Sequence, residues 1–208
     1  MKYRLVAFDL DGTLTKGEGS WWMLHRRFGT LERSIELDHL YSQGKISYRQ
    51  YMLMDLSMWP KPLARSMLQE VLLKYQLREE AKDVVDNLKR AGIKTAVVTA
   101  ALDIIAEDLC KKLGIEYCMC NKIGFDTNDI YNGSVYPLVD PKNKHLALQK
   151  LSKETGVKLD SVLAVGDSDY DTTFLKSAGK GLLIGNEILA KQIGIEAIPN
   201  LSAVLSYL

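Results

Sequence analysis

Residues 5–13, with the sequence LVAFDLDGT, decide the fold of this 208-residue chain. An apolar run of strand character stops at Asp9, and a second carboxylate, Asp11, follows two residues later. Because side chains of an extended chain alternate with a period of two, Asp9 and Asp11 can leave the strand end on the same side. Two carboxylates so placed can share a hard cation and leave one of them free to react. We therefore expect Asp9 to be a nucleophile in phosphoryl transfer.

Composition and charge are those of an ordinary globular protein with a sizeable core. Hydrophobic residues make up 47% of the chain and charged residues 25%. The 27 Lys and Arg residues nearly balance the 26 Asp and Glu residues, which argues against nucleic acid as a partner. No apolar run is long enough for a signal peptide or a membrane span, so we expect a cytoplasmic protein without a membrane partner. The three cysteines are expected to be free thiols.

Helix-like and strand-like segments alternate through most of the chain. The strand-like segments are residues 3–9, 93–99, 115–120, 161–166 and 181–184. The helix-like segments are residues 79–90, 102–113, 141–154 and 169–177, followed by two short ones near Ile188 and Leu201. This alternation predicts an α/β fold, a Rossmann-like parallel sheet with helices on both faces. Turn-forming residues interrupt the pattern within residues 122–139, which predicts a β-hairpin appended to the sheet.

Residues 16–76 have a different character from the rest. Apolar residues recur there at helical spacing, aromatic residues are frequent, and three breaks divide the segment, which predicts roughly four helices and no strand. We therefore predict two domains. The α/β core domain comprises residues 1–15 and 77–208, and residues 16–76 form a small all-helical cap inserted after the first strand.

Polar side chains stand at the ends of three predicted core strands. They are Asp9 with Asp11, then Thr99, then the acids that begin with Asp167. Ligands of open α/β sheets bind outside the carboxyl ends of the strands, so we expect these groups to converge. Asp9, Asp167 and the backbone carbonyl of Asp11 could hold Mg²⁺. Thr99 could donate to a phosphate oxygen, and a lysine after Pro141 could neutralise another.

Asp11 is the candidate for general acid and base. It could protonate the leaving oxygen and later deprotonate the water that attacks an aspartyl-phosphate. The first step requires a raised pKa, which neighbouring carboxylates would favour and a metal would oppose. Taken alone, the acids of residues 167–171 would equally suit the first turn of a helix.

The sequence DLDGT at residues 9–13, then Thr99, a lysine, and GDSDYD at residues 166–171, resembles the four ordered motifs of the haloacid dehalogenase superfamily. The chain is most similar to the phosphoserine phosphatase-like branch. The resemblance implies that Asp9 is the nucleophile, Asp11 the general acid and base, and Thr99 the phosphate-binding hydroxyl. It also implies that Asp167 is a metal ligand and that Asp171 is a ligand or a partner of one.

The lysine motif and the substrate contacts follow from the same resemblance. Lys142 and Lys144 both compete for the lysine, and Lys144 is favoured because KHLAL at residues 144–148 resembles the lysine-led helix of that branch. The substrate-binding residues implied are Glu18, Thr99, Ala100 and Lys144. Gly17 and Gly19 flank Glu18, as expected for a hinge that lets a cap open and close.

Asp11 also indicates the class of reaction, because dehalogenases of this superfamily lack an acid at that position. We expect Mg²⁺-dependent hydrolysis of a small phosphomonoester, with phosphoserine-like substrates included, through an aspartyl-phosphate. The alternatives are a phosphomutase or phosphotransferase that uses the same intermediate, and a non-catalytic phospholigand-binding protein. The expected partner is a small phosphorylated metabolite, and the expected assembly is a monomer or a homodimer.

The sequence offers several candidates for the cap residues that contact the leaving group. In the phosphoserine phosphatases a cap arginine pairs with the serine carboxylate, and here Arg49 and Arg65 both compete for that place. Trp21, Trp22 and Trp59 are candidates for substrate contact, although an aromatic stripe on helices more often packs in a core.

Overall fold

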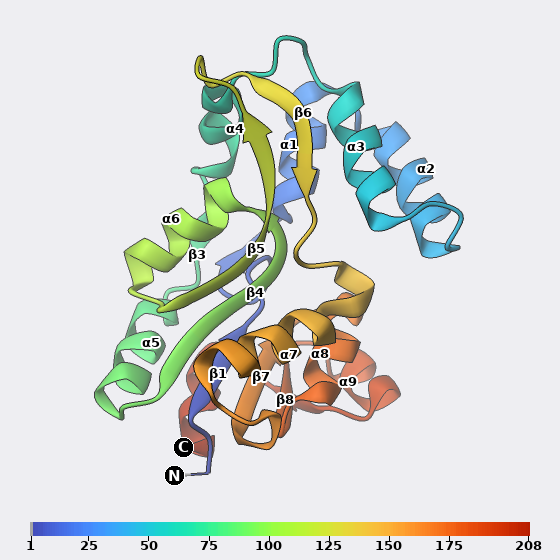
Figure 1. Cartoon of the computed structure of the whole chain (residues 1–208). Helices are drawn as coiled ribbons and strands as arrows, with labels where there is room; N and C mark the ends of the chain where they lie inside the picture. Colours follow the sequence, from blue (N-terminus) through green and yellow to red (C-terminus); the bar gives the residue numbers. More distant parts are fainter. Residues whose placement is uncertain (1) are drawn as a thin grey trace.

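The computed structural model describes residues 2–208, which form a seven-stranded sheet with helices on both faces (Figure 1). The strand order is β6-β5-β4-β1-β7-β8-β9. These strands are β1 (Leu5–Phe8), β4 (Lys94–Leu102), β5 (Tyr117–Phe125), β6 (Tyr131–Tyr136), β7 (Val162–Gly166), β8 (Lys180–Ile184) and β9 (Glu196–Ile198). All neighbouring strands run parallel except β5 and β6. The predicted Rossmann-like sheet is confirmed.

Strand β1 is the centre of the sheet, between β4 and β7. All four of its side chains are fully buried, as expected of a parallel strand covered on both faces. Leu5 and Ala7 pack in the core formed with the helices at residues 144–155, 172–177 and 187–193, whereas Val6 and Phe8 pack in the core formed with those at residues 81–90, 103–113 and 201–207. Because successive side chains of β1 point to opposite faces of the sheet, this one strand packs against both layers of helices.

The helices of the α/β core follow the predicted segments closely. They are the α-helices α5 (Ala81–Arg90), α6 (Asp103–Leu113), α7 (Lys144–Thr155), α8 (Thr172–Ser177) and α9 (Glu187–Ile193), with the 3-10 turns η1 (Pro141–Asn143), η2 (Leu159–Ser161), η3 (Asp169–Asp171) and η4 (Leu201–Tyr207). The predicted helices at 141–154 and 169–177 both begin as 3-10 turns, η1 and η3. Across residues 2–208, every helix is too short or too polar to cross a membrane.

Four helices fill most of residues 16–76, as predicted. They are α1 (Ser20–Phe28), α2 (Leu31–Ser42), α3 (Tyr48–Met58) and α4 (Arg65–Leu72). The chain enters and leaves them through a pair of short antiparallel strands, β2 (Thr15–Lys16) and β3 (Gln76–Leu77), which the sequence pattern did not predict. We retain residues 16–76 as the proposed cap domain, with this pair of strands as its connection to the core.

The predicted hairpin is present, but its boundaries differ from the prediction. Strand β5 runs without a break from the sheet into the hairpin, where the prediction placed one strand to residue 120 and a separate hairpin after it. The tip of the hairpin meets the cap, because Ala64 bridges Ile130 and the Tyr131 N–H donates to the Leu63 carbonyl at 2.9 Å. In Figure 1, β6 accordingly runs beside the cap helices.

Two further details differ from or complete the prediction. Strand β9 continues the sheet beyond β8, whereas the prediction ended the sheet at β8. The sequence pattern missed β9 because this strand has only three residues and begins with the exposed Glu196. The three cysteines are unpaired, as expected, with Cys110 and Cys120 buried and Cys118 half-buried.

Candidate active site

The polar ends of three neighbouring strands meet at one edge of the sheet. Asp9 follows β1, Thr99 lies in β4, and Asp167 follows β7, and β1 pairs with both of the other strands. These side chains line one cavity of about 380 Å³, which the cap side chains Trp21 and Tyr48 line from the other side. The predicted convergence at the carboxyl ends of the strands is therefore present.

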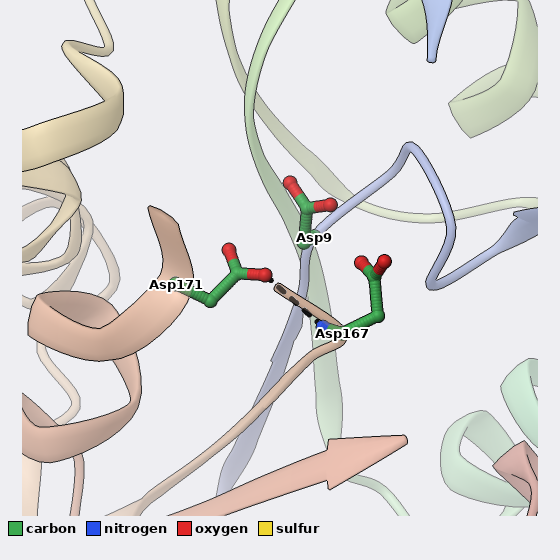
Figure 2. Close-up of side chains that lie close together, drawn as sticks. All are labelled: Asp9, Asp167 and Asp171. Atoms are coloured by element: carbon green, nitrogen blue, oxygen red, sulfur yellow. Dashed lines mark hydrogen bonds between the residues drawn. The ribbon is translucent and has the colours of Figure 1, made fainter. Parts of the chain in front are cut away.

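Three carboxylates form a compact cluster at the base of the cavity. Asp9, Asp167 and Asp171 each place a carboxylate oxygen within 4.8 Å of the others, and Figure 2 shows them gathered around the end of β1. Asp171 also accepts hydrogen bonds from the backbone N–H groups of Asp167 (3.0 Å) and Ser168 (3.1 Å). Asp171 thus caps the start of η3, which is the helix-capping role that the acids of residues 167–171 also suited in the sequence. It belongs to the carboxylate cluster as well. Oxygen donors in this number could hold a hard divalent cation.

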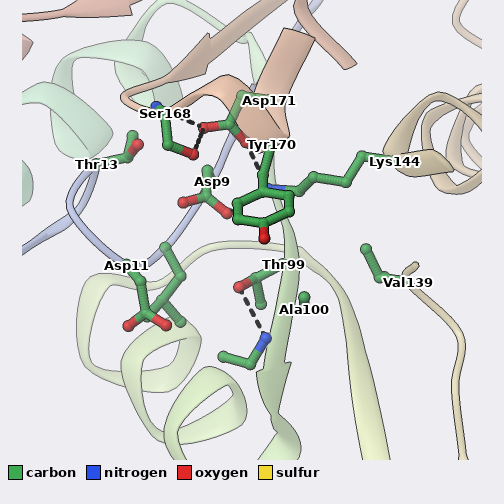
Figure 3. A network of polar contacts seen from close by, with 12 residues as sticks. Asp9, Asp11, Thr13, Thr99, Ala100, Val139, Lys144, Ser168, Tyr170 and Asp171 are labelled. Atoms are coloured by element: carbon green, nitrogen blue, oxygen red, sulfur yellow. Dashed lines mark hydrogen bonds and ion pairs between the residues drawn. The ribbon is translucent and has the colours of Figure 1, made fainter. Parts of the chain in front are cut away.

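Lys144, the first residue of α7, is buried among these carboxylates. Its Nζ lies 2.5 Å from Asp9 Oδ1 and 2.6 Å from Asp171 Oδ1 (Figure 3). Lys142 instead donates to the cap carbonyls of Tyr41 (2.7 Å) and Ser42 (2.6 Å). Of the two lysines that the sequence left open, the structure therefore brings only Lys144 to the carboxylates.

Burial dominates the electrostatics of this cluster. Burial lowers the pKa of Lys144, but the carboxylates of Asp171 and Asp9 outweigh it, so that the net pKa is raised and the ammonium stays charged. Burial raises the pKa of Asp9. The positive charge of Lys144 lowers this pKa, whereas the negative charges of Asp171 and Asp167 raise it further. Burial, with the charge of Asp171, raises the pKa of Asp167 to about 6. One ammonium facing three carboxylates leaves a net negative site that a divalent cation would neutralise.

Asp167 is held by close contact with the DLDGT segment. The Thr13 hydroxyl donates to Asp167 Oδ1 at 2.9 Å. Gly12 has φ +80°, and a Cβ at that position would lie 2.1 Å from Asp167 Oδ2. Only glycine fits there, because any side chain would occupy the place of the Asp167 carboxylate and would strain the backbone. Gly12 and Thr13 therefore fix the third carboxylate of the cluster.

Asp11 points away from the cluster, toward the cap. Its Oδ2 accepts hydrogen bonds from the backbone N–H (2.9 Å) and the hydroxyl (2.6 Å) of Ser20, the first residue of α1. Its side chain keeps some exposed surface, yet protein atoms surround the carboxyl group, and this burial raises its pKa against the opposing hydrogen bonds from Ser20. Burial, rather than a neighbouring carboxylate, is thus the main cause of the raised pKa of Asp11.

Thr99 and Ala100 lie where the sequence placed them, and a residue that it missed supports them. Thr99 is buried, and its Oγ1 accepts from the Ala101 N–H at 3.1 Å, which leaves its hydroxyl proton free to donate. Buried Asn121 donates to the Ala100 carbonyl (2.9 Å) and to the Val139 carbonyl (2.9 Å), and it accepts from the Val139 N–H (2.8 Å). A polar residue directly after the predicted strand at 115–120 was the only available signal for Asn121.

Glu18, Arg49 and Arg65 do not line this cavity in the structure. Glu18 pairs with Arg26 at 2.6 Å, and this hydrogen-bonded partner lowers the pKa of Glu18. Arg49 donates to the Val135 carbonyl at 2.8 Å. Arg65 pairs with Asp129 at 2.9 Å and lies 3.9 Å from the centre of the Phe125 ring. Both arginines thus hold the cap against the hairpin.

Aromatic cap residues divide between the cavity and the core. Trp21 and Trp22 line the cavity, whereas Trp59 is buried, with its ring 5.6 Å from that of Trp21 and 5.5 Å from that of Phe28. Five further residues line the cavity without having been expected there from the sequence, namely Asp38, Tyr41, Tyr48, Tyr51 and Tyr170. The aromatic stripe was visible in the sequence, but which rings face the cavity depends on how the helices pack.

Comparisons with known proteins agree with the motifs. A family model described as haloacid dehalogenase-like hydrolase matches residues 3–179. The phosphoserine phosphatase of Archaeoglobus fulgidus is 25% identical over 190 residues, which are 91% of this chain and 55% of that protein, so the chain spans about half of that relative. The phosphoserine phosphatase of Methanocaldococcus jannaschii is 26% identical over 178 residues, 86% of this chain and 83% of that one. A solved substrate-bound phosphoserine phosphatase complex matches with a TM-score of 0.80 and 25% identity, over 100% of this chain and 99% of the other. The predicted resemblance to the phosphoserine phosphatase-like branch is confirmed.

Proposed function

The chain belongs to the haloacid dehalogenase-like hydrolases, and we propose that it is a Mg²⁺-dependent phosphatase that hydrolyses a small phosphomonoester. The observation that carries this proposal is the cavity under the cap, which Asp9, Lys144 and Asp167 line and behind which buried Asp171 completes the cluster. Phosphoryl transfer needs an in-line nucleophile and compensation of the negative charge on the transferred group. A carboxylate nucleophile beside a fixed ammonium and a cation site meets both needs.

The carboxylate cluster suits Mg²⁺ by its chemistry. Its donors are hard oxygens, they are close enough to share one ion, and they exceed the positive charge of Lys144. Asp9, Asp167 and Asp171 would hold the ion, with the Asp11 carbonyl as a further proposed ligand. When bound, Mg²⁺ would polarise a phosphoryl oxygen and neutralise the charge that develops there.

The reaction would proceed in two steps on this chain's own residues. The Asp9 carboxylate attacks phosphorus, the bond from phosphorus to the leaving oxygen breaks, and Asp11 gives its proton to that oxygen. Asp11 then takes a proton from a water that attacks the aspartyl-phosphate, which releases inorganic phosphate and restores Asp9. The raised pKa of Asp11 favours the acid form that the first step needs. Thr99 would donate to one phosphoryl oxygen and Lys144 would neutralise another.

The proposal is tested with Asp9→Asn and an aryl phosphate in the presence of Mg²⁺. We expect the substitution to lower kcat by about a thousandfold or more, and a chelator to abolish turnover until Mg²⁺ is restored. Asp169→Asn, which removes an exposed acid from the same loop as the cluster, is the control and should retain turnover. Wild-type turnover by Asp9→Asn would refute the proposed nucleophile.

The physiological substrate, location and assembly are proposals that follow from the relatives. Because the Archaeoglobus and Methanocaldococcus relatives are phosphoserine phosphatases, phosphoserine is the first substrate to test. Release of inorganic phosphate, with none transferred to an added alcohol, would distinguish hydrolysis from phosphotransfer. We keep the expected cytoplasmic location and the monomeric or homodimeric state as part of the proposal.

A further inference from the structure

The cap end of the cavity is walled by aromatic rings. The Tyr41 and Tyr51 rings stack with centroids 5.2 Å apart and an interplanar angle of 3°, and the Tyr48 ring is tilted against both. Trp22 from α1 and Tyr170 from η3 line the same cavity. Its volume of about 380 Å³ is at the small end of ligand sites, which span about 300–1,000 Å³. A substrate held here would place its leaving group among these rings.

Charge at this end of the cavity is negative. Asp38 of α2 lines it, and the Tyr170 hydroxyl donates to Asp38 Oδ1 at 2.8 Å. Among the cavity-lining residues that the structure describes, Lys144 alone is basic, and it is paired with Asp9 and Asp171. A leaving group that carries a carboxylate, as phosphoserine does, would therefore meet an acid and no cation.

Three of the hydrogen-bond donors of this wall are already in use within the protein. The Trp21 indole N–H donates to the Ala100 carbonyl at 3.0 Å, the Tyr41 hydroxyl to Asp140, and the Tyr170 hydroxyl to Asp38. A sugar or a carboxylate would need such donors. An organic ammonium ion needs none, because aromatic faces and a carboxylate are the groups that bind it.

We propose that the leaving alcohol of the substrate carries a positively charged ammonium group and no carboxylate, and that the aromatic wall and Asp38 hold this group. This inference rests on the proposed function, because it names the alcohol whose phosphate ester Asp9 would attack. The phosphate would lie at the Lys144 end and the cation at the Asp38 end. A zwitterionic aminoalkyl phosphate such as phosphocholine offers a phosphate to the Lys144 end of the cavity and a cation to the Asp38 end.

The test compares phosphocholine with 3,3-dimethylbutyl phosphate, which has the same shape but a carbon atom in place of the charged nitrogen. Phosphoethanolamine, phosphoserine and glucose 6-phosphate complete the panel. We expect kcat/KM for phosphocholine to exceed that for the neutral isostere by about tenfold or more. Asp38→Asn should reduce this ratio severalfold. Glu36→Gln removes an exposed charge from the same helix and should not change the ratio.

Each outcome bears on one of the two proposals. Equal kcat/KM for phosphocholine and its isostere, or a preference for phosphoserine or glucose 6-phosphate, overturns the ammonium site and leaves the phosphatase standing. If no ester is hydrolysed, the phosphatase proposal fails, and tryptophan fluorescence titrations with choline and 3,3-dimethylbutanol decide the ammonium site. Tighter binding of choline that Asp38→Asn weakens supports the site, and equal or no binding overturns it.

Discussion

The Asp11 carboxylate accepts two hydrogen bonds from Ser20, from its backbone N–H at 2.9 Å and from its hydroxyl at 2.6 Å. Asp11 follows the central strand of the core, whereas Ser20 begins the first helix of the proposed cap. The position of the proposed general acid therefore depends on the position of the cap. A cap that moved away from the core would release Asp11 from these bonds, so that proton transfer and closure would be coupled.

Asp11→Asn should affect esters according to their leaving group. General acid catalysis contributes about 10²–10⁴-fold, and it matters most where the leaving alcohol is strongly basic. We expect kcat for an alkyl phosphate to fall by about a hundredfold or more and kcat for p-nitrophenyl phosphate to fall much less. Steady-state kinetics on both esters check this. An equal loss on both would contradict the role of Asp11 as the acid.

Ser20→Ala should weaken catalysis through the position of Asp11. The substitution removes the hydroxyl bond of 2.6 Å and keeps the backbone one, and a hydrogen bond to a charged group contributes about 1.5–3 kcal/mol. We expect kcat for an alkyl phosphate to fall about tenfold and the melting temperature to fall by several degrees. Ser20→Thr, which keeps a hydroxyl, should recover most of the activity; equal losses in both variants would contradict a role for the hydroxyl.

Lys144→Met and Lys142→Met should differ sharply. Lys144 is buried against Asp9 and Asp171, and the loss of one partner of a buried ion pair costs about 3–5 kcal/mol because the remaining charges are unpaired. We expect Lys144→Met to lower the free energy of unfolding by that order and to abolish turnover. Lys142→Met loses contacts with two cap carbonyls and with the Tyr41 ring, whose centre lies 4.6 Å from Lys142 Nζ. It should therefore lower the free energy of unfolding less than Lys144→Met does and should keep kcat/KM within a few fold of the wild-type value. Denaturant unfolding in excess EDTA, together with kcat/KM in Mg²⁺, makes the comparison.

Gly12→Ala should act on the metal rather than on the fold alone. The new Cβ would take the place of Asp167 Oδ2, and mutation of residues that orient a metal ligand typically costs about 10–100-fold in metal affinity. We expect the Mg²⁺ concentration for half-maximal activity to rise by that factor. Gly29→Ala is the control, because Gly29 has a similar φ of +68° with no atom within 4 Å of the added Cβ. An unchanged Mg²⁺ requirement in Gly12→Ala would refute Asp167 as a ligand.

The strands that the sequence pattern did not predict correctly are either very short or extend across two predicted elements. Strands β2, β3 and β9 have two or three residues each, too few for a period of two to be visible. Strand β5 crosses from the sheet to the hairpin through Asn121, a residue type that is common in turns, so its pattern was interpreted as two elements. In each case pairing with a partner strand, rather than local preference, makes the segment extended.

The sequence by itself determined the sheet and the reacting end of the site. The buried run that ends at Asp9 and the run that ends at Asp167 are local patterns, and parallel pairing then brings their ends together. Local pattern could not choose between Lys142 and Lys144, since two residues on a helical turn point in different directions.

Only the tertiary structure decided what faces the leaving group. Asp38 and Tyr51 come from two different helices, and neither has a neighbour in sequence that indicates a site. Tyr170 lies within the GDSDYD motif, but the motif does not indicate that its ring lines the cavity. Trp59, with the same aromatic character, packs in the core instead. The difference arises because helix packing determines which side of each helix lines the cavity, and that packing depends on contacts between residues far apart in the chain.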